Sequence, residues 1–270
     1  MTQNNLGNGL QVLGERSEGE AGARHLVDAV AAFKAALEVY TRNDMPADWA
    51  MTQYNLGNAL QVLGERSEGE IGAKHLADAV AAYKAALEVR TRQEMPAQWA
   101  MTQNNLGNAL ATLGESSEGG AGAKHLADAV AAFKAALEVY TRKDIPAQWA
   151  ITQNNLGNAL QTLGERSEGV AGAQHLANAV RAYKAALEVH TRQEMPAQWA
   201  MTQNNLGNAL AILGERSAGK AGAKQLADAV AAYEAALEAL GQPGMEYYAT
   251  LARKNLELAK AKLAARGSQE

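Results

Sequence analysis

Apolar residues recur along the chain at helical spacings, in blocks separated by short polar stretches that contain glycine. In residues 46–63, Leu56, Leu60 and Leu63 form one apolar stripe, and Pro46 suits the first turn of a helix. A second block begins near Ala73, and its apolar residues mark one helical face: Leu76, Ala79, Val80, Tyr83, Ala86 and Leu87. The pattern therefore predicts a first helix and a second helix, and no strand.

The glycine-rich run between the two blocks predicts a long turn. We expect Gly64 to end the first helix and residues 65–69 to lie in the turn. Ser67 and Glu70 have the spacing of a capping box, which predicts that Ser67 caps the second helix. The run lacks a Lys-Ser or Lys-Thr pair and follows a helix, so it is not expected to bind phosphate.

The two-helix pattern repeats with a period of 50 residues. The string Leu-Gly-Asn-(Ala or Gly)-Leu begins at Leu6, Leu56, Leu106, Leu156 and Leu206. Residues 51–100 and 101–150 differ at 11 positions and are identical at the other 39. Because one helical hairpin cannot cover its own apolar face, neighbouring copies must stack. We predict five repeats in residues 1–240, namely 1–50, 51–100, 101–150, 151–200 and 201–240.

The two ends of the array differ from its interior. The sequence of residues 241–244 is expected to break the last second helix, and residues 241–270 to form a capping helix and a tail. This cap has Glu257 and Lys260 where the repeats have Gly and Leu, so its outer face is polar. The first repeat lacks the Pro-Ala-Asp-Trp-Ala lead of the second, which predicts an apolar N-terminal edge without a cap.

Composition narrows the class of protein further. The 270 residues include no cysteine, which excludes disulfides and thiolate metal sites and fits a reducing compartment, so a cytoplasmic protein is expected. Apolar residues never run on for the length of a membrane span, so no membrane partner is expected. A net charge of -4, with acidic and basic residues interleaved, argues against nucleic acid as a partner.

The spacing of small, apolar and aromatic residues in each repeat forms a motif. Leu56-Gly57 is followed three positions on by Leu60, and the second helix contains Ala79 and Tyr83 in the pattern Ala-x-x-x-aromatic. This motif resembles the tetratricopeptide repeat (TPR), whose usual period is about 34 residues. Relative to that period we expect about ten extra residues in the inner turn and about six between repeats. The repeat is thus similar to longer bacterial variants, and its Asn-Asn-Leu string also resembles kinesin light chain repeats.

The resemblance implies an all-α fold, a right-handed superhelical solenoid of antiparallel helix pairs. It also implies that the first helices line a concave groove that binds a protein or peptide. Winding the first helix at about 100° per residue places its Leu residues on one side and its Asn residues on the other. The predicted groove residues are Asn4, Asn8, Gln11, Tyr54, Asn58, Gln61, Asn104, Asn108, Asn154, Asn158, Gln161, Asn204 and Asn208.

The chemistry of this polar ladder indicates what it would bind. A carboxamide offers donors and acceptors, as an extended peptide backbone requires, whereas a chain-terminal carboxylate would call for Lys or Arg. The family's carboxylate clamps use Lys near these positions, where this sequence has Asn or Tyr. We therefore expect a neutral, extended segment as the ligand. The alternative is that these Asn residues are merely solvated polar positions.

Other repeated residues have simpler interpretations. Gly7 and Gly14 lie on a flank of the first helix, where they would let the second helix approach closely. Trp49 and its equivalents are expected to fill the junctions between repeats. His25 and its equivalents recur one repeat apart, so neither a metal site nor another cofactor is expected. Residues 40, 90, 140, 190 and 240 vary between repeats, which suggests partial exposure.

Every polar residue recurs with the repeat, so nothing unique is left to act as nucleophile, base or paired carboxylate, and no enzyme is expected. A scaffold for protein–protein interaction is the expected function. The open N-terminal edge also favours self-association, end to end or by domain swapping, which a monomeric mass in light scattering at high concentration would exclude. A fragment of a larger protein, or an engineered scaffold without its own ligand, is a further alternative.

Overall fold

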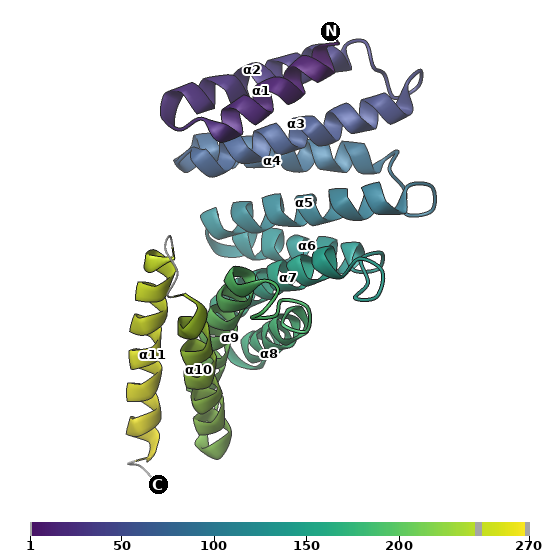
Figure 1. Cartoon of the computed structure of the whole chain (residues 1–270). Coiled ribbons are helices and arrows are strands. Elements are labelled where there is room, and N and C mark those ends of the chain that lie inside the picture. Colours follow the sequence, from purple (N-terminus) through teal and green to yellow (C-terminus); the bar gives the residue numbers. More distant parts are fainter. Residues whose placement is uncertain (1, 241–244, 268–270) are drawn as a thin grey trace. The chain divides into compact units, whose positions relative to one another are not determined.

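The chain folds into helical hairpins, as the computed structural model shows for residues 2–240 and 245–267 (Figure 1). This described part has eleven helices and no strand, so the predicted all-α helical repeat is confirmed. It forms two compact units, Met1–Val139 and Tyr140–Glu270. The helices are α1 (Gln3–Arg16), α2 (Gly19–Leu37), α3 (Pro46–Arg66), α4 (Gly69–Leu87), α5 (Pro96–Ser116), α6 (Gly119–Ala136), α7 (Pro146–Arg166), α8 (Gly169–Ala186), α9 (Pro196–Arg216), α10 (Gly219–Ala239) and α11 (Glu246–Gly267). The handedness of the superhelix stays a prediction.

Helices stack in the order of the sequence within each unit. Each first helix packs against the second helix of its own repeat, and that second helix packs against the next first helix, as α3, α4 and α5 do. Successive first helices also touch one another: α1 with α3, α3 with α5, α7 with α9, and α9 with α11. The apolar stripe of the first helix faces these neighbours, because Leu56, Leu60 and Leu63 are all buried. The predicted stripe is therefore confirmed.

The inner turn is shorter than the sequence suggested. The first helix continues through Gly64 to Arg66, and only Ser67 and Glu68 separate it from the second helix, which begins at Gly69 with φ of 60°. That left-handed conformation suits glycine, because a side chain would be strained there. The expected ten-residue insertion in the turn is thus wrong, since those residues lengthen the two helices. The capping box is also wrong, because Glu68 is the N-cap and makes no side-chain cap bond.

Glycine lies inside the first helix where the second helix comes closest. A methyl group on Gly57 would lie 2.6 Å from Cε1 of Tyr83, and one on Gly64 would lie 2.6 Å from Cγ of Leu76. Both distances are far below van der Waals contact, so only glycine allows this approach. The close approach predicted at Gly7 and Gly14 is confirmed, because a methyl group there would lie 2.6 Å from Cε1 of Phe33 and 2.7 Å from Cγ of Leu26. The prediction that Gly64 ends the first helix is wrong, because α3 continues to Arg66.

Arginine at the end of a first helix caps the first helix of the preceding repeat. Nη1 of Arg66 donates to the carbonyl oxygens of Gly14 (2.8 Å) and Ser17 (3.1 Å), and Nη2 donates to that of Glu15 (3.0 Å). The end of α1 would otherwise leave such carbonyls without partners. Arg216 and Arg266 make the corresponding bonds in the second unit. These bonds tie consecutive repeats together.

The third repeat departs from this rule. Its first helix ends in Ser116, whose hydroxyl donates to the carbonyl of Leu113 in its own helix (3.2 Å). The corresponding carbonyls at the end of α3 therefore receive no guanidinium from this position.

The loop that joins one repeat to the next is longer and is held by a threonine. After α4 ends at Leu87, the backbone N–H of Glu94 donates to Oγ1 of Thr91 (3.2 Å) and that of Met95 to the Thr91 carbonyl (2.9 Å). Ion pairs link these loops to the following second helix: Arg42 with Glu88, Arg92 with Glu138, Arg142 with Glu188, and Arg192 with Glu238. The predicted long connection between repeats is confirmed at this loop.

The variable residues at the end of the second helix are buried, which corrects the expectation of partial exposure. Arg90, Tyr140, His190 and Leu240 are all buried, and Tyr40 is half-buried. The guanidinium of Arg90 donates to Oγ1 of Thr102 (3.0 Å) and lies 4.5 Å from the ring centre of Tyr54, and burial lowers its pKa. Each of these side chains fills the space between one repeat and the next, and that space accepts side chains of different size and polarity.

A single histidine is buried at one of these junctions. His190 is 3% exposed, and its Nδ1 lies 3.1 Å from Oγ1 of Thr202, whose hydroxyl donates to the carbonyl of Gln198 (2.7 Å). Nδ1 is therefore the protonated nitrogen, and Nε2 is buried without a hydrogen-bond partner among the described residues. Burial accordingly lowers the pKa of His190 below its ordinary value.

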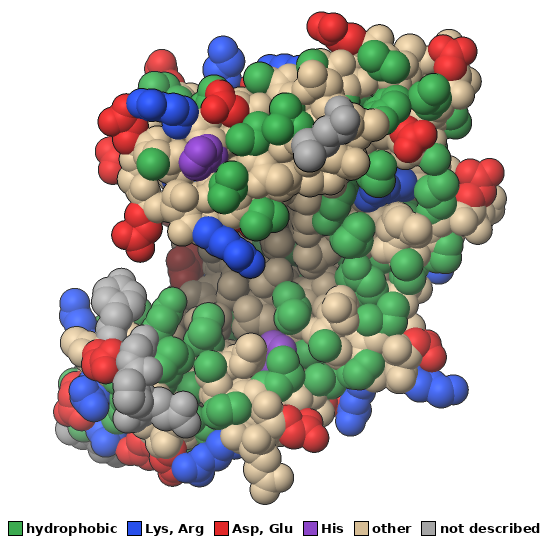
Figure 2. All heavy atoms as spheres, turned by 45° about the horizontal axis from the view of Figure 1, so that its top comes forward, with side chains coloured by type: hydrophobic (Ala, Val, Ile, Leu, Met, Phe, Trp, Pro, Cys, Tyr) green, Lys and Arg blue, Asp and Glu red, His purple; other side chains and the backbone are tan. Residues whose placement is uncertain are grey.

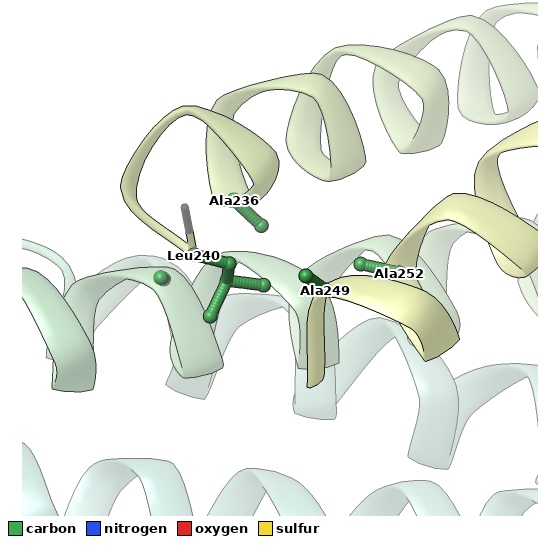
Figure 3. Close-up of a cluster of buried hydrophobic side chains, with 5 residues drawn as sticks. Ala236, Leu240, Ala249 and Ala252 are labelled. Atoms are coloured by element: carbon green, nitrogen blue, oxygen red, sulfur yellow. The ribbon is translucent and has the colours of Figure 1, made fainter. Parts of the chain in front are cut away.

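The last described helix, α11, packs on the end of α10. Ala249 and Ala252 of α11 pack on Ala236 and Leu240 at the end of α10 (Figure 3), and the partly buried Trp199 packs against this cluster, as expected for a junction residue. Lys260 also faces α10, because it pairs with Glu234 of that helix (3.0 Å). The exposed residues of α11 include Glu257 but also Leu251 and Leu258, so the prediction of a polar outer face is wrong. The predicted helix break at residues 241–244 lies outside the described residues.

The N-terminal helix presents its apolar stripe differently from the others. Leu6 and Leu13 are 42% and 52% exposed, whereas Leu56 and Leu63 at the equivalent positions of α3 are buried. The expected apolar face of the first repeat is therefore present. Self-association through it stays a prediction.

We predict that the same substitution acts in opposite directions at two glycines of the first unit. Gly57→Ala is expected to lower the free energy of unfolding by about 1–3 kcal/mol, because its methyl group would overlap Tyr83. Gly9→Ala is expected to raise it by about 0.5–1 kcal/mol, because nothing lies within 4 Å of a Cβ there and alanine favours helix. Urea unfolding followed by circular dichroism measures both. Equal shifts would contradict the close-approach account.

A second prediction concerns pH. Below about pH 6.5 the unfolded chain binds a proton at His190, while the folded chain with its lowered pKa does not, so the free energy of unfolding falls as pH decreases. His190→Leu, which copies Leu240 of the fifth repeat, is expected to lose this part of the pH dependence. Urea midpoints at pH 8 and pH 5 measure it, and the other histidines, present in both proteins, serve as the internal control. Parallel pH profiles would contradict the prediction.

Candidate functional site

One face of each first helix is left open by the packing of its neighbours. In α9 this face carries Met201, Asn208, Ile212 and Glu215, which follow one another at helical spacing. Met201 and Glu215 are exposed, and Asn208 and Ile212 are half-buried. We call this surface the first-helix face. It runs from apolar residues at the start of the helix, through carboxamides, to a glutamate at the end.

The predicted groove residues occupy or border this face in different ways. Asn8 is exposed, and most of the others are half-buried: Gln11, Tyr54, Asn58, Gln61, Asn104, Asn108, Asn154, Asn158, Gln161, Asn204 and Asn208. Asn4 is only 3% exposed, and its Oδ1 accepts from Oγ1 of Thr52 (3.2 Å). The expectation that Asn4 is open to a ligand is therefore wrong, because the Asn4 side chain points from α1 toward α3 and is buried there.

In the three repeats whose second helix carries a tyrosine, the middle carboxamide of the first helix joins three helices. Oδ1 of Asn58 accepts from the hydroxyl of Tyr83 in α4 (2.8 Å) and from Nδ2 of Asn105 in α5 (3.1 Å). The second unit repeats the arrangement at Asn158, with Tyr183 and Asn205, and at Asn208, with Tyr233 and Asn255. These oxygens thus have a structural role.

Burial keeps the tyrosine donors protonated. The pKa of Tyr83 is well above its ordinary value, first because of burial and then because of the nearby Tyr54 and Glu65. Burial and the charge of Glu215 raise the pKa of Tyr233 in the same way. A neutral hydroxyl donates its proton, so Oδ1 of Asn58 and Asn208 must be the acceptor. What these carboxamides can offer a ligand is their Nδ2 donor.

Sequence reasoning missed the partner asparagines. Asn55, Asn105, Asn205 and Asn255 donate to the preceding repeat, and Asn55 reaches Oδ1 of Asn8 (3.0 Å). A signal for them was present, because the capping helix keeps Asn255 while it replaces other repeated residues. The bond of Asn255 to Oδ1 of Asn208 (3.1 Å) accounts for this retention.

A pocket of about 380 Å³ opens on the first-helix face of the second unit. It spans three successive first helices, and two of the predicted residues, Gln161 and Asn208, belong to its wall. The lining comprises Gln161 and Glu165 of α7, Asn208, Ala211, Ile212 and Glu215 of α9, Tyr233 of α10, and Leu251, Asn255, Leu258, Ala259 and Lys262 of α11. The pocket combines an apolar floor with polar and charged edges.

The described residues show no further candidate site based on charge, metal binding or membrane insertion. On the side of the molecule drawn in Figure 2, Lys, Arg, Asp and Glu side chains are scattered over each unit without a continuous area of one sign. In residues 2–240 and 245–267, no group of three or more His, Asp or Glu is arranged to hold a metal ion. None of the described helices combines the length and apolar character needed to cross a membrane.

Comparison with known proteins finds similarity among solved structures. No protein-family model matches it, and no curated protein matches it either. Among solved structures it is similar to the TPR2AB-domain:pHSP90-complex of yeast Sti1, with 16% identity over 98% of this chain and 95% of that one, and a TM-score of 0.33. It is also similar to a chain from the computational design of self-assembling cyclic protein homooligomers, with 15% identity over 99% of this chain and 94% of that one, and a TM-score of 0.26.

Proposed function

We propose that the chain is a scaffold for protein–protein interaction of the long tetratricopeptide type, and that its first-helix face binds an extended segment of a partner protein. The observation that carries this proposal is the pocket that crosses α7, α9 and α11. A surface built from equivalent positions of successive repeats suits a ligand that runs across the repeats. A segment of extended chain has that form.

The hydrogen-bonding capacity of the face supports an extended backbone as ligand. The Oδ1 atoms of Asn158 and Asn208 are each engaged by two donors, so their Nδ2 groups are what a ligand can meet. Carbonyl oxygens of an extended segment are acceptors at regular intervals, and they complement such donors. In this proposal the asparagine ladder binds only backbone carbonyls of the ligand. The sequence-based prediction assigns it both donor and acceptor roles.

The charge of the face argues against a partner that ends in a free carboxylate there. The predicted groove residues include no Lys or Arg, and Glu165 and Glu215 stand at the edge of the pocket. A carboxylate placed beside them would be repelled rather than bound. A neutral or cationic segment therefore fits the proposal better.

Catalysis is not part of the proposal. The polar groups of the face are carboxamides, hydroxyls and glutamates, which recur from repeat to repeat and already bond to one another, as Gln161 does to Glu165 (2.9 Å). No arrangement of nucleophile and base stands out among the described residues of the pocket.

Two arginine substitutions in the fifth repeat test the proposal. Ala211→Arg places a bulky cation in the pocket and is expected to weaken binding of a partner captured from a lysate by at least about tenfold. Ala231→Arg is the matched control, because Ala231 is exposed on the second helix and the fourth repeat already has Arg181 at that position. Isothermal titration with the purified partner measures both. Equal affinities for the two variants would exclude the first-helix face as the binding site.

A further inference from the structure

We infer that the pocket between α7, α9 and α11 takes a bulky apolar side chain of the partner segment, with a Lys or Arg of the same segment beside it. This inference rests on the proposed function and adds the chemistry of the partner to it. It is carried by the positions at which this end of the array departs from the repeat.

The capping helix replaces the repeated asparagine with leucine. Leu258 stands where the five repeats have Asn8, Asn58, Asn108, Asn158 and Asn208. In three repeats that oxygen accepts a tyrosine hydroxyl from the following second helix, whereas the side chain of Leu258 has no hydrogen-bonding atom. Leu258 is 52% exposed and lines the pocket together with Leu251, which is exposed as well. An apolar wall thus replaces a polar one.

The fifth first helix also has a small apolar residue at the pocket. Ala211, like Ala111 of the third repeat, stands where α3 and α7 have a glutamine over the tyrosine of the second helix; Gln61 and Gln161 accept from Tyr83 and Tyr183. Truncation to alanine leaves open volume over Tyr233, which lines the pocket. The next residue, Ile212, is apolar, as Val12 and Val62 are in the first two repeats. The pocket therefore lies where Ala211 and Ile212 stand beside Leu258, the residue that replaces the repeated asparagine.

Exposed apolar surface in a recess of this size favours an apolar side chain. Burial of a Leu, Ile or Phe side chain stabilises a complex by about 1.5–3 kcal/mol, and a recess concentrates that gain in one residue of the ligand. The volume of about 380 Å³ leaves room for one such side chain with part of the adjoining backbone. A single apolar anchor is therefore the expected feature of the ligand.

The edge of the pocket carries more negative than positive charge. Glu165 accepts from Gln161, and Glu215 pairs with Lys262, so two carboxylates stand against one ammonium group. Both glutamates are exposed, and a cationic side chain next to the anchor would reach them through water-accessible space. Because the pocket edge carries this excess of negative charge, we expect a Lys or Arg next to the apolar anchor residue of the ligand.

Selection from a random peptide library on the immobilised full chain tests the inference. The expected result is a shared sequence with one large apolar residue and a Lys or Arg within about three residues of it. A synthetic peptide of that sequence is expected to bind at least about tenfold more weakly to Leu258→Asn, which restores the repeat residue. Glu165→Gln is expected to weaken binding about threefold and to reduce its salt dependence.

The matched control is Val170→Ala in the same unit, which removes an apolar side chain that is 87% exposed and lies outside the pocket. It is expected to leave affinity unchanged. Acidic or non-apolar selected sequences, no selected sequence, or equal binding to Leu258→Asn would each overturn the inference. The proposed function is judged separately, because loss of the captured partner by Ala211→Arg would still support it.

Discussion

The structure depends on satisfying the carbonyl groups at the end of each first helix. A helix leaves such carbonyls without partners, and here the guanidinium of the next repeat supplies the missing donors, as Arg66 does for α1. Where the arginine is present, three bonds from one planar group stabilise the distance and the register between neighbouring first helices, whereas α3 and α5 pack together without them. Glycine at positions such as Gly57 brings the second helix close to the first, and in three repeats a tyrosine hydroxyl then reaches the asparagine in the middle of the first helix, as Tyr83 reaches Asn58.

This packing determines which groups remain for a ligand. The carboxamide oxygens of Asn58, Asn158 and Asn208 are used between helices, so the polar ladder is first a structural element. Its remaining donors, together with the pocket beside α11, form the surface on which we place partner binding. Because the repeats are nearly identical, a residue that differs from its equivalents in the other repeats points to a local change in function. Leu258, which replaces an asparagine that all five repeats share, marks the place where the face changes from polar to apolar.

Much of the fold was predictable because the same hydrophobic pattern recurs in every repeat. The Leu56, Leu60 and Leu63 stripe and the close-approach glycines were confirmed. The length of the inner turn was not predictable from composition. Glycine often ends a helix, but Gly64 lies inside α3, where it makes room for the side chain of Leu76. Burial of His190 was also missed, since variation at one position resembles exposure. The pairing of Asn105 with Asn58 depends on contacts between repeats, which periodicity alone does not specify.

The most direct test of the capping account uses the repeat that lacks the arginine. Ser116→Arg should let α5 cap the carbonyls at the end of α3, as Arg66 does for α1, and raise the free energy of unfolding by about 1 kcal/mol in urea unfolding. Ser116→Lys is the control, because it adds the same charge near a helix end without the planar fork. The account predicts a clear gain for arginine over lysine, and equal stability of the two variants would contradict it.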